Sequence, residues 1–588
     1  MPEKPSNFWQ ELKRRKVIHV TIGYAAASYI ILELTSIIAD PFGLPEWTLR
    51  FVFILLCVGF IIAVILSWLY DFAPGGIKKT ATTKPAKEVA VKPGKKRLKV
   101  SDAVIAALLI AVIVLAYPRI FNKNKPEANE VTWTHSIAVL PFADMSPEQD
   151  QEFFCDGMAE EIINALTNVD KLRVIARTSS FAFKGKDVDV KTIGNQLGVT
   201  SLLEGSIRKS GDQLRVTAQL VRTSDGVHLW SEQYNRNLTD VFAIQEEIAL
   251  SVVDQLKMKL LGDEKERITM RLTDNLEAHH HYLRGRHILN RRKKEDIFTA
   301  IDYFKKALEL DSLYVMGYIG LADAYALLPS YAAEPANEAY PLAKAAISKA
   351  LEINDQVGEA YASLGWIRML ADWDWKGAEE AFQKAVSLNP GYATTYHWYG
   401  YLYMIMGKMD KSIPIVKKAL DLDPLSPVIN RVIGDVYYFS HQYDEAITPL
   451  KKTLELEPCM PFAHLQLSLC YLQKSMYDEA IEELTKEKQC RENPSGVEYV
   501  LGLIHVKMGE MDKAREVLRE LEERNIKGSG TAQLYFALGD NENGFKMLEE
   551  MYENDDTWLI YINSNPWFDN VRSLPRFKNL IKKIGLGE

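Results

Sequence analysis

The sequence predicts a multidomain protein with three parts: an α-helical transmembrane module, an α/β domain and an all-α solenoid of paired helices. Three observations predict this fold class. Apolar runs near the amino terminus reach the roughly 20 residues that a membrane-crossing helix needs. Short segments in the middle of the chain alternate between apolar and polar residues, which is typical of β-strands. Beyond Ala278, small residues recur every 34 positions, which indicates a helical repeat.

These patterns divide the 588 residues into consecutive segments. The predicted segments are a cytoplasmic basic tail (1–16), three transmembrane helices (17–38, 51–70 and 103–121), a basic cytoplasmic loop (71–102), an α/β domain (136–257), a helical-repeat array (278–556) and a C-terminal helical cap (557–588). Several domains are expected in a chain of this length, because single cores stop growing near about 250–300 residues.

The three apolar segments differ in how well they fit a membrane span. The second contains no charged residue, whereas the third is apolar without interruption only over 103–117 and is marginal. The loop at 71–102 carries nine basic residues against three acidic ones, and basic loops resist translocation. This bias predicts a multi-pass protein of the cytoplasmic (inner) membrane, with the C-terminal domains extracytoplasmic, on the periplasmic side. Lipid would be contacted through the three spans and through the basic loop.

Residues 136–257 read as one α/β domain. Strands at 201–209, 213–223 and 226–236 are separated by Ser-Gly and Asp-Gly pairs, which are typical of hairpin turns. Helices are expected before and after this meander. His228 and Trp230 share one face of the last strand, which predicts either a ligand-binding surface or a covered sheet edge.

Two groups of residues suggest chemistry at first sight. Asp156, Glu160 and Glu161 fall on one predicted helix and could act as an acid–base pair, but acidic residues near a helix start also complement its macrodipole, which we favour. The histidines at 279–281 are adjacent, so their side chains point about 100° apart on a helix and cannot converge on one ion. No phosphate-binding loop of the GxxxxGK[ST] pattern occurs. We therefore expect no enzymatic activity, no cofactor and no metal site.

Charge and cysteine usage exclude further classes. The net charge of −8 gives no general attraction to nucleic acid, and no nucleic-acid partner is expected. The five cysteines contain no C-x-x-C pair, so they form neither a disulfide framework nor a zinc pattern. We expect them to be small buried residues, and a Cys470–Cys490 disulfide stays open as an alternative.

The helical array rests on two series of small residues. Gly400, Gly434, Ser468 and Gly502 are spaced by 34, and Ala350, Ala385, Ala419 and Thr453 form a second series. Prolines at 390, 424 and 458 follow the second helix of each predicted hairpin, where they can end a helix but not continue one. Seven to eight hairpins are expected, closed by a polar-faced cap of the kind that solenoids require.

Three parts of the sequence resemble known families. The phrases IAVLPFAD, FFCDGMAEEIINAL and LLEGSIRKSGDQLRVTAQLVRTSDGVHLWSEQYNR resemble the TolB-like amino-terminal domain, which implies a binding fold with no established active site. The repeat IGDVYYFSHQYDEAITPLKKTLELEP is similar to the tetratricopeptide (TPR) family. The stretch FWQELKRRKVIHVTIGYAAASYIILE resembles the membrane module that opens many bacterial proteins combining these two domains.

The TPR resemblance implies that the first helix of each hairpin lines the concave face of the solenoid. The residues at its lining positions, which we predict to bind a protein or peptide partner, are Trp366, Met369, His397, Tyr401, Met404, Arg431, Asp435, Tyr438, Phe462, Leu465 and Leu469. Such an apolar and aromatic strip is expected to be covered by a peptide, a helix or another domain. Two interpretations stay open: a partner groove, or a groove already filled by neighbouring helices or the α/β domain.

The resulting functional expectation is a membrane-anchored extracytoplasmic scaffold or sensor, with the α/β domain as a second binding module. The alternative is an accessory component of a nucleotide-cyclase-type or membrane-bound transcriptional signalling system, without a catalytic or DNA-binding domain of its own. An enzyme is disfavoured, because every long stretch of the chain already has another assignment.

Overall fold

The computed structural model of the chain describes residues 133–587, apart from 149–150, 238–239, 259, 261–263, 333 and 491–496, and scattered positions between 24 and 79. The chain forms two compact units, Met1–Lys125 and Pro126–Glu588. In the first unit, β1 (Tyr70–Ala73) and β2 (Gly76–Lys79) form an antiparallel hairpin. The Tyr24 hydroxyl of this unit donates a hydrogen bond to the Leu56 carbonyl at 2.9 Å.

The predicted transmembrane module is contradicted. Among the positions that the structure describes, no helix is both long and apolar enough to span a bilayer. A span requires about 20 consecutive helical residues, and an apolar composition alone does not supply that continuity. This finding corrects both the transmembrane part of the fold class and the multi-pass inner-membrane location. Most of the three predicted spans, the tail at 1–16 and most of the loop at 71–102 lie outside the described residues.

The second unit begins with an α/β domain built on a mixed sheet in the order β5-β3-β6-β7-β8, with β4 also paired to β6. The strands are β3 (His135–Val139), β4 (Ala143–Asp144), β5 (Leu172–Val174), β6 (Ser201–Ser210), β7 (Gln213–Arg222) and β8 (His228–Asn237). The helices are α5 (Glu152–Thr167), α6 (Arg177–Phe181), α7 (Val190–Leu197), α8 (Val241–Gln255) and α9 (Glu264–Ile268). The first strands run parallel, whereas β6, β7 and β8 form the predicted antiparallel meander.

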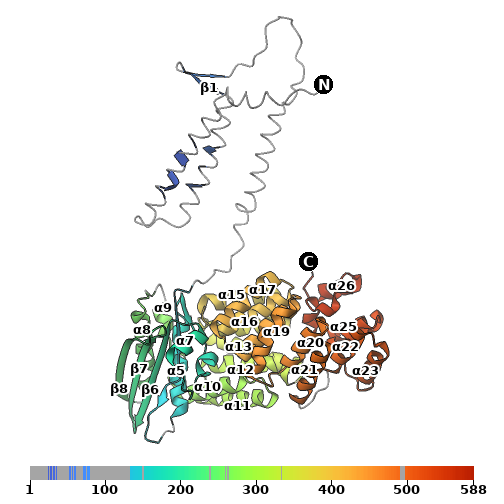
Figure 1. Cartoon of the computed structure of the whole chain (residues 1–588). Helices are drawn as coiled ribbons and strands as arrows, with labels where there is room; N and C mark the ends of the chain where they lie inside the picture. The colour runs from blue at the N-terminus through green and yellow to red at the C-terminus, as the bar shows by residue number, and fades with distance from the viewer. Residues whose placement is uncertain are drawn as a thin grey trace. The chain divides into compact units, whose positions relative to one another are not determined.

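The alternation of apolar and polar residues explains why these segments form strands and why one face of the meander is buried. In β7, Leu214, Val216, Ala218 and Leu220 are buried and alternate with more exposed residues. Their side chains form one core with α5 and α8 on the same face of the sheet, and α7 covers the other face through Ile193 and Leu197. Figure 1 shows these helices against the sheet.

The rest of the unit is a helical solenoid. Its helices are α10 (Leu276–Leu289), α11 (Lys294–Leu310), α12 (Val315–Tyr331), α13 (Ala336–Ile353), α14 (Gly358–Ile367), α15 (Trp375–Leu388), α16 (Ala393–Ile405), α17 (Met409–Leu422), α18 (Pro427–Phe439), α19 (Tyr443–Leu456), α20 (Ala463–Gln473), α21 (Tyr477–Cys490), α22 (Glu498–Met508), α23 (Met511–Glu523), α24 (Ser529–Ala537), α25 (Asn541–Glu553) and α26 (Pro575–Lys583). A π-helical turn, η2 (Arg368–Asp372), follows α14, and two 3₁₀ turns, η3 (Leu559–Asn563) and η4 (Pro566–Phe568), follow α25. Helices α10 to α25 pair into eight hairpins, which agrees with the predicted seven to eight.

The 34-residue period has a steric cause. A side chain at Gly400 would place its Cβ 2.2 Å from Val416 Cγ1, and one at Gly434 would lie 2.6 Å from Leu450 Cγ. Only a small residue therefore lets the two helices of a hairpin approach. The turn inside four successive hairpins, from α16–α17 to α22–α23, repeats as well, because Gly407, His441, Ser475 and Gly509 all have a left-handed backbone, with φ between 61° and 80°.

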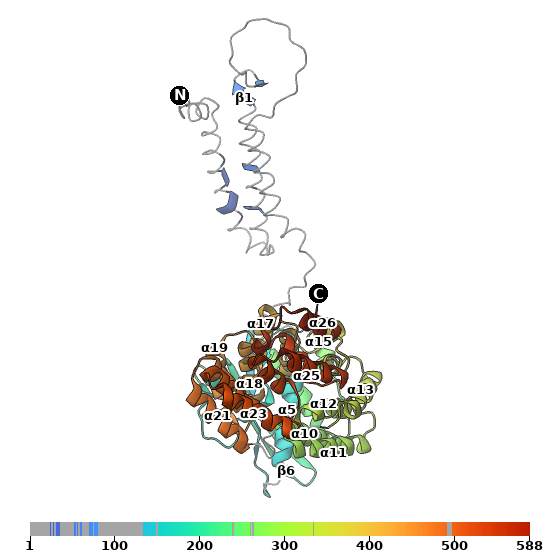
Figure 2. The same ribbon diagram turned by 90° about the vertical axis from the view of Figure 1, so that its right-hand side faces the viewer.

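The predicted C-terminal cap does more than cover the last hairpin. Residues Asp556–Asn565, here called the closing segment, contain η3 and fold back against the middle of the solenoid. Asn563 Nδ2 donates to the Ile405 carbonyl at 2.9 Å, and the Tyr340 and Thr557 hydroxyls lie 3.1 Å apart. Beyond the segment, Trp375 Nε1 at the start of α15 donates to the Ile584 carbonyl, just after α26, at 2.8 Å, and the two helices lie close together in the view of Figure 2.

The α/β domain and the solenoid share a buried interface. Asp423, after α17, accepts hydrogen bonds from the backbone N–H and the hydroxyl of Ser179, at 3.1 and 2.5 Å. The Ala176 N–H donates to the Leu422 carbonyl at 2.8 Å. Burial raises the pKa of the Asp423 carboxyl to about 6. These contacts make the α/β domain part of the same compact unit as the repeats.

The cysteines differ from the expectation. Cys459 and Cys490 form a disulfide with a Cα–Cα distance of 5.3 Å, whereas Cys470 is free and buried. The Cys470–Cys490 alternative is therefore wrong, although Cys490 is a disulfide residue. Cys459 was not predicted as the disulfide partner of Cys490, because it lies in the turn before α20 and the helix pattern does not show the direction of a side chain in that turn.

Candidate functional site

The solenoid encloses a cavity of about 160 Å³, here called the inner cavity. Its walls come from the first helices of successive hairpins, α12 to α24, and from the closing segment. Nine predicted partner-binding residues line it: Trp366, His397, Tyr401, Arg431, Asp435, Tyr438, Phe462, Leu465 and Leu469. The other two, Met369 and Met404, are fully buried in the surrounding core. Nine of the eleven residues predicted from their helix positions therefore lie around one cavity.

The closing segment covers this cavity. The Tyr561 ring lies edge-on to Tyr401, with centroids 6.4 Å apart, and the Trp558 ring lies 5.4 Å from the ring of Phe462. Of the predicted residues, only Phe462 and Leu465 keep partial exposure, whereas Tyr401 is 6% and Tyr438 1% exposed. At Tyr401 and Phe462 the groove is thus covered within the chain by the closing segment, whereas His397 also borders a second cavity that residues of α5 in the α/β domain help to line. Partner binding at these residues stays a prediction that requires this segment to move.

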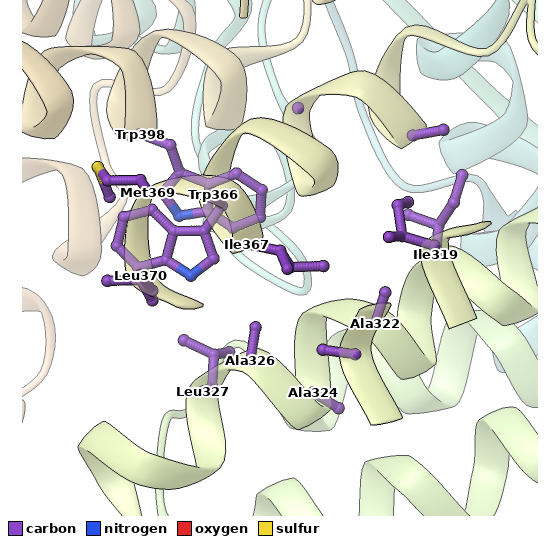
Figure 3. Close-up of a cluster of buried hydrophobic side chains, with 14 of the residues drawn as sticks. Ile319, Ala322, Ala324, Ala326, Leu327, Trp366, Ile367, Met369, Leu370 and Trp398 are labelled. Atoms are coloured by element: carbon purple, nitrogen blue, oxygen red, sulfur yellow. The ribbon is translucent and has the colours of Figure 1, made fainter. Parts of the chain in front are cut away.

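Aromatic stacking forms one wall of the cavity. The indoles of Trp366 and Trp398 stack with centroids 5.2 Å apart and an interplanar angle of 18°, as Figure 3 shows. Met369, Ile367 and Leu370 pack around the same indole pair in this hydrophobic core. The polar atoms of this indole pair are the two Nε1 atoms, and Trp366 Nε1 has no hydrogen-bond partner among the described residues.

Arg431, Asp435 and Tyr401 form a polar, hydrogen-bonded wall of the same cavity. Arg431 Nη1 lies 2.5 Å from Asp435 Oδ2, and the Tyr401 hydroxyl donates to the same oxygen at 2.7 Å. Arg431 Nη2 also donates to the Tyr401 hydroxyl at 3.2 Å. Burial moves the pKa of His397 well below its ordinary value, and the nearby Arg292 and Arg431 lower it further. His397 is therefore a neutral imidazole beside two guanidinium groups.

One charged residue of this site was not predicted from the helix positions. Arg292 lies in the turn between α10 and α11 and is 8% exposed, with its guanidinium over the Tyr331 ring at 5.9 Å. Counting along first helices could not find it, because it comes from a turn. The only signal in the sequence is the basic run Arg291 to Lys294, which normally indicates a solvated turn.

The residues proposed for ligand binding in the α/β domain are on an edge strand. His228 is exposed, and Trp230 is partly buried against the core that also holds Tyr234. Strand β8 is the last in the sheet order. The structure therefore favours the covered-edge interpretation for Trp230, while ligand binding at His228 stays a prediction.

The carboxylates on α5 do not form an acid–base pair. Asp156 contacts Lys184 at 2.7 Å, and Glu160 contacts Arg177 at 2.8 Å. Glu161 Oε1 lies 3.2 Å from Nε2 of His279, across the interface with the solenoid. The macrodipole explanation is wrong for Glu160 and Glu161, because they lie in the middle of a helix that begins at Glu152 and the dipole acts only within the first turn.

The first histidine of the run, His279, lies at the interface between the solenoid and the α/β domain. His279 Nδ1 lies 2.9 Å from the Tyr314 hydroxyl, and burial lowers the pKa of His279 to about 4. Burial also raises the pKa of Glu161 to about 7, so this interface favours the uncharged form of both groups. In the part of the chain that the structure describes, no cluster of three or more His, Cys, Asp or Glu residues could hold a metal ion.

Comparisons with known families match three stretches. Residues 133–251 match the model of the HilA/YgeH-like transcriptional regulator, second domain. Residues 393–424 match a tetratricopeptide repeat, and residues 440–521 match subunit 3 of the anaphase-promoting complex, cyclosome. Tetratricopeptide repeats therefore build the solenoid. The resemblance of the α/β domain to the TolB-like domain stays a prediction.

Individual relatives cover only parts of the chain. A protein of Rhizobium meliloti (strain 1021) described as "Putative adenylate cyclase 3" is 39% identical over 193 residues, which are 33% of this chain and 32% of that protein. The chain thus spans about a third of the curated relative that it matches. Among solved structures, pilF of Pseudomonas aeruginosa is 20% identical with a TM-score of 0.30, over 38% of this chain and 99% of that one. The crystal structure of PilW, a type IV pilus biogenesis factor, is 21% identical with a TM-score of 0.30, over 33% and 90%.

Proposed function

We propose that the chain is an interaction scaffold without catalytic activity, in which the TPR solenoid binds a protein partner and the docked α/β domain is a second binding module. The observation that carries this proposal is the inner cavity, where first helices of many hairpins present aromatic and charged side chains together. Aromatic residues and Arg are the types most often found as binding hot spots. The TPR repeats support protein binding in general, and we propose the inner cavity as the site where the partner binds.

Partner access depends on the closing segment. It inserts Trp558 and Tyr561 against Phe462 and Tyr401, which are two of the predicted partner-binding residues. Trp558 is 38% exposed, so this part of the closing segment is accessible to solvent. A partner that places its own aromatic side chains at these positions would displace the segment and gain the same ring contacts.

Site-specific photo-crosslinking in the full-length chain tests this proposal. A crosslinking amino acid at Leu465, on the partly exposed edge of the cavity, should capture a defined partner in cells, and the double variant Trp558→Ala/Tyr561→Ala should raise the yield. The control position is Phe298, which is 40% exposed on α11, the second helix of its hairpin. No product at Leu465, or equal products at both positions, would contradict the partner site.

A more specific role has support from the family comparisons. The match to a domain of transcriptional regulators and the relative with a cyclase description suggest that the scaffold acts in a regulatory assembly of one of these two types. In this role the chain itself would turn over no nucleotide. Purified full-length protein should convert neither ATP nor GTP, and saturable turnover that a point substitution abolishes would overturn this part of the proposal.

A further inference from the structure

A buried arginine without a counter-ion lies at the inner cavity. The Arg292 side chain is 8% exposed, and among the described residues no acceptor lies within hydrogen-bonding distance of its Nε or Nη1. Buried polar groups almost always have partners, and a buried charge without one is costly. Such a group points to an ion or ligand that completes it.

The repeat architecture does not impose this burial. Arg292 has a left-handed backbone with φ of 58°, like the residues at the corresponding turns of later hairpins. Gly407, His441, Ser475 and Gly509 occupy those turns, and all four are exposed. A residue at this turn can therefore face solvent, and the first hairpin instead directs a guanidinium inward.

The neighbouring carboxylates already have other partners. Arg431 pairs with Asp435 at 2.5 Å, and Arg286 pairs with Asp323 at 2.6 Å. The Ser363 hydroxyl donates to the second Asp323 oxygen at 2.5 Å. Burial lowers the pKa of Arg292, and the nearby charges of Arg286 and Arg431 lower it further, against the opposing effects of Tyr331 and Asp323.

Further groups without a hydrogen-bond partner among the described residues line the same cavity, both donors and acceptors; the acceptors are Asp435 Oδ1 and Gln533 Oε1. Trp366 Nε1, Arg431 Nε and Gln466 Nε2 have no acceptor among the described residues. Tyr331, Trp398 and Tyr401 supply aromatic walls. A cavity of about 150 Å³ holds a benzene ring, so the inner cavity, at about 160 Å³, has room for a ligand of that size.

We propose that the inner cavity binds a small organic carboxylate, with its carboxylate on the Arg292 guanidinium and its planar apolar body among the aromatic walls. Arg favours such ligands because its planar fork of N–H groups matches two carboxylate oxygens. This inference goes beyond protein binding, because the ligand occupies the cavity while the closing segment is in place. It would stabilise the closed solenoid by mass action.

Calorimetric titration and thermal unfolding of the full-length protein with benzoate test the site. Benzoate should bind saturably and raise the unfolding temperature, whereas benzamide, which has the same shape without the charge, should do neither. Arg292→Gln should weaken benzoate binding at least tenfold, and Arg292→Lys, which keeps the charge but loses the fork, should lie between. Arg291→Gln is the matched control, because its side chain is 55% exposed in the same turn.

Each outcome decides for or against the site. Equal effects of benzoate and benzamide, or benzoate affinity unchanged in Arg292→Gln, would overturn it. Acetate or inorganic phosphate binding as tightly as benzoate would overturn the assignment to a carboxylate with an apolar body. If Arg292→Gln does not fold, the comparison of benzoate with benzamide on the native protein decides alone. Partner capture at Leu465 needs no benzoate, so failure of this site and failure of the scaffold proposal are distinguishable.

Discussion

At the residue scale, burial decides what a substitution at the predicted groove positions reports. Tyr438 is 1% exposed, and truncation of a buried aromatic residue costs about 3–5 kcal/mol, more than the roughly 2 kcal/mol that defines a binding hot spot. Tyr438→Ala should therefore lower the free energy of unfolding by about 3–5 kcal/mol in denaturant titrations. Leu465→Ala, at a partly exposed position, should cost less. A Tyr438→Ala protein as stable as the native one would contradict the closed solenoid.

Asp423 makes stability depend on pH at the domain interface. Burial raises the pKa of its carboxyl from 3.8 to about 6, so the folded state holds this proton more tightly than the unfolded state does. Its contribution is therefore largest at low pH and is lost as pH rises from about 4 to about 6. Relative to Asp423→Asn, the free energy of unfolding of the native protein should fall by up to about 3 kcal/mol across this window. A difference that is constant with pH would refute this, and exposed Asp421→Asn is the matched control.

At the scale of elements, the period of the sequence was sufficient to predict a helix or strand wherever one face of that element is buried against its neighbour. The meander β6–β8 was predicted because alternate residues of β7 are buried, and the hairpins because Gly400 and Gly434 leave no room for a side chain. The same reasoning found nine residues of the inner cavity, since first helices repeat in register. Arg292 and Cys459 were missed because turns carry no period that shows which way a side chain points.

The disulfide acts at this scale, because it joins the turn before α20 to the end of α21. Cys459 and Cys490 are 31 positions apart, and a cross-link of this loop length stabilises by about 3–4 kcal/mol, chiefly by restricting the unfolded chain. Cys459→Ser should lower the free energy of unfolding by about that amount under non-reducing conditions. Reductant should lower the stability of the native protein to that of the variant and leave the variant unchanged. A native protein that does not respond to reductant would show that this bond is absent in solution.

At the scale of the molecule, the second unit is held together by contacts between residues far apart in sequence. Ser179 of the α/β domain and Asp423 of the solenoid are 244 positions apart, and Asn563 of the closing segment reaches Ile405 across 158 positions. Local patterns hold no information about such pairs. The sequence therefore predicted the solenoid and its lining, but not that the C-terminal segment would fold back and fill it.

The closing segment leads to a prediction about the dynamics of the whole solenoid. Trp558→Ala/Tyr561→Ala removes ring contacts to Phe462 at 5.4 Å and to Tyr401 at 6.4 Å, and each aromatic pair contributes about 0.5–1.5 kcal/mol beyond its buried area. Amides of α16 and α18, which line the inner cavity, should then exchange hydrogen roughly tenfold faster, because a tenfold change corresponds to about 1.4 kcal/mol of local stability.

Hydrogen exchange followed by mass spectrometry on the full-length protein gives this measurement, with Phe298→Ala as the exposed control on α11. Amides of β6 and β7 should keep their native rates, because the described core on the α5 and α8 side of this sheet contains no residue of the closing segment. Faster exchange in the sheet as well would indicate global loss of stability in place of opening. Native rates in α16 and α18 would show that the solenoid stays closed without these two side chains, and that partner access depends on another part of the chain.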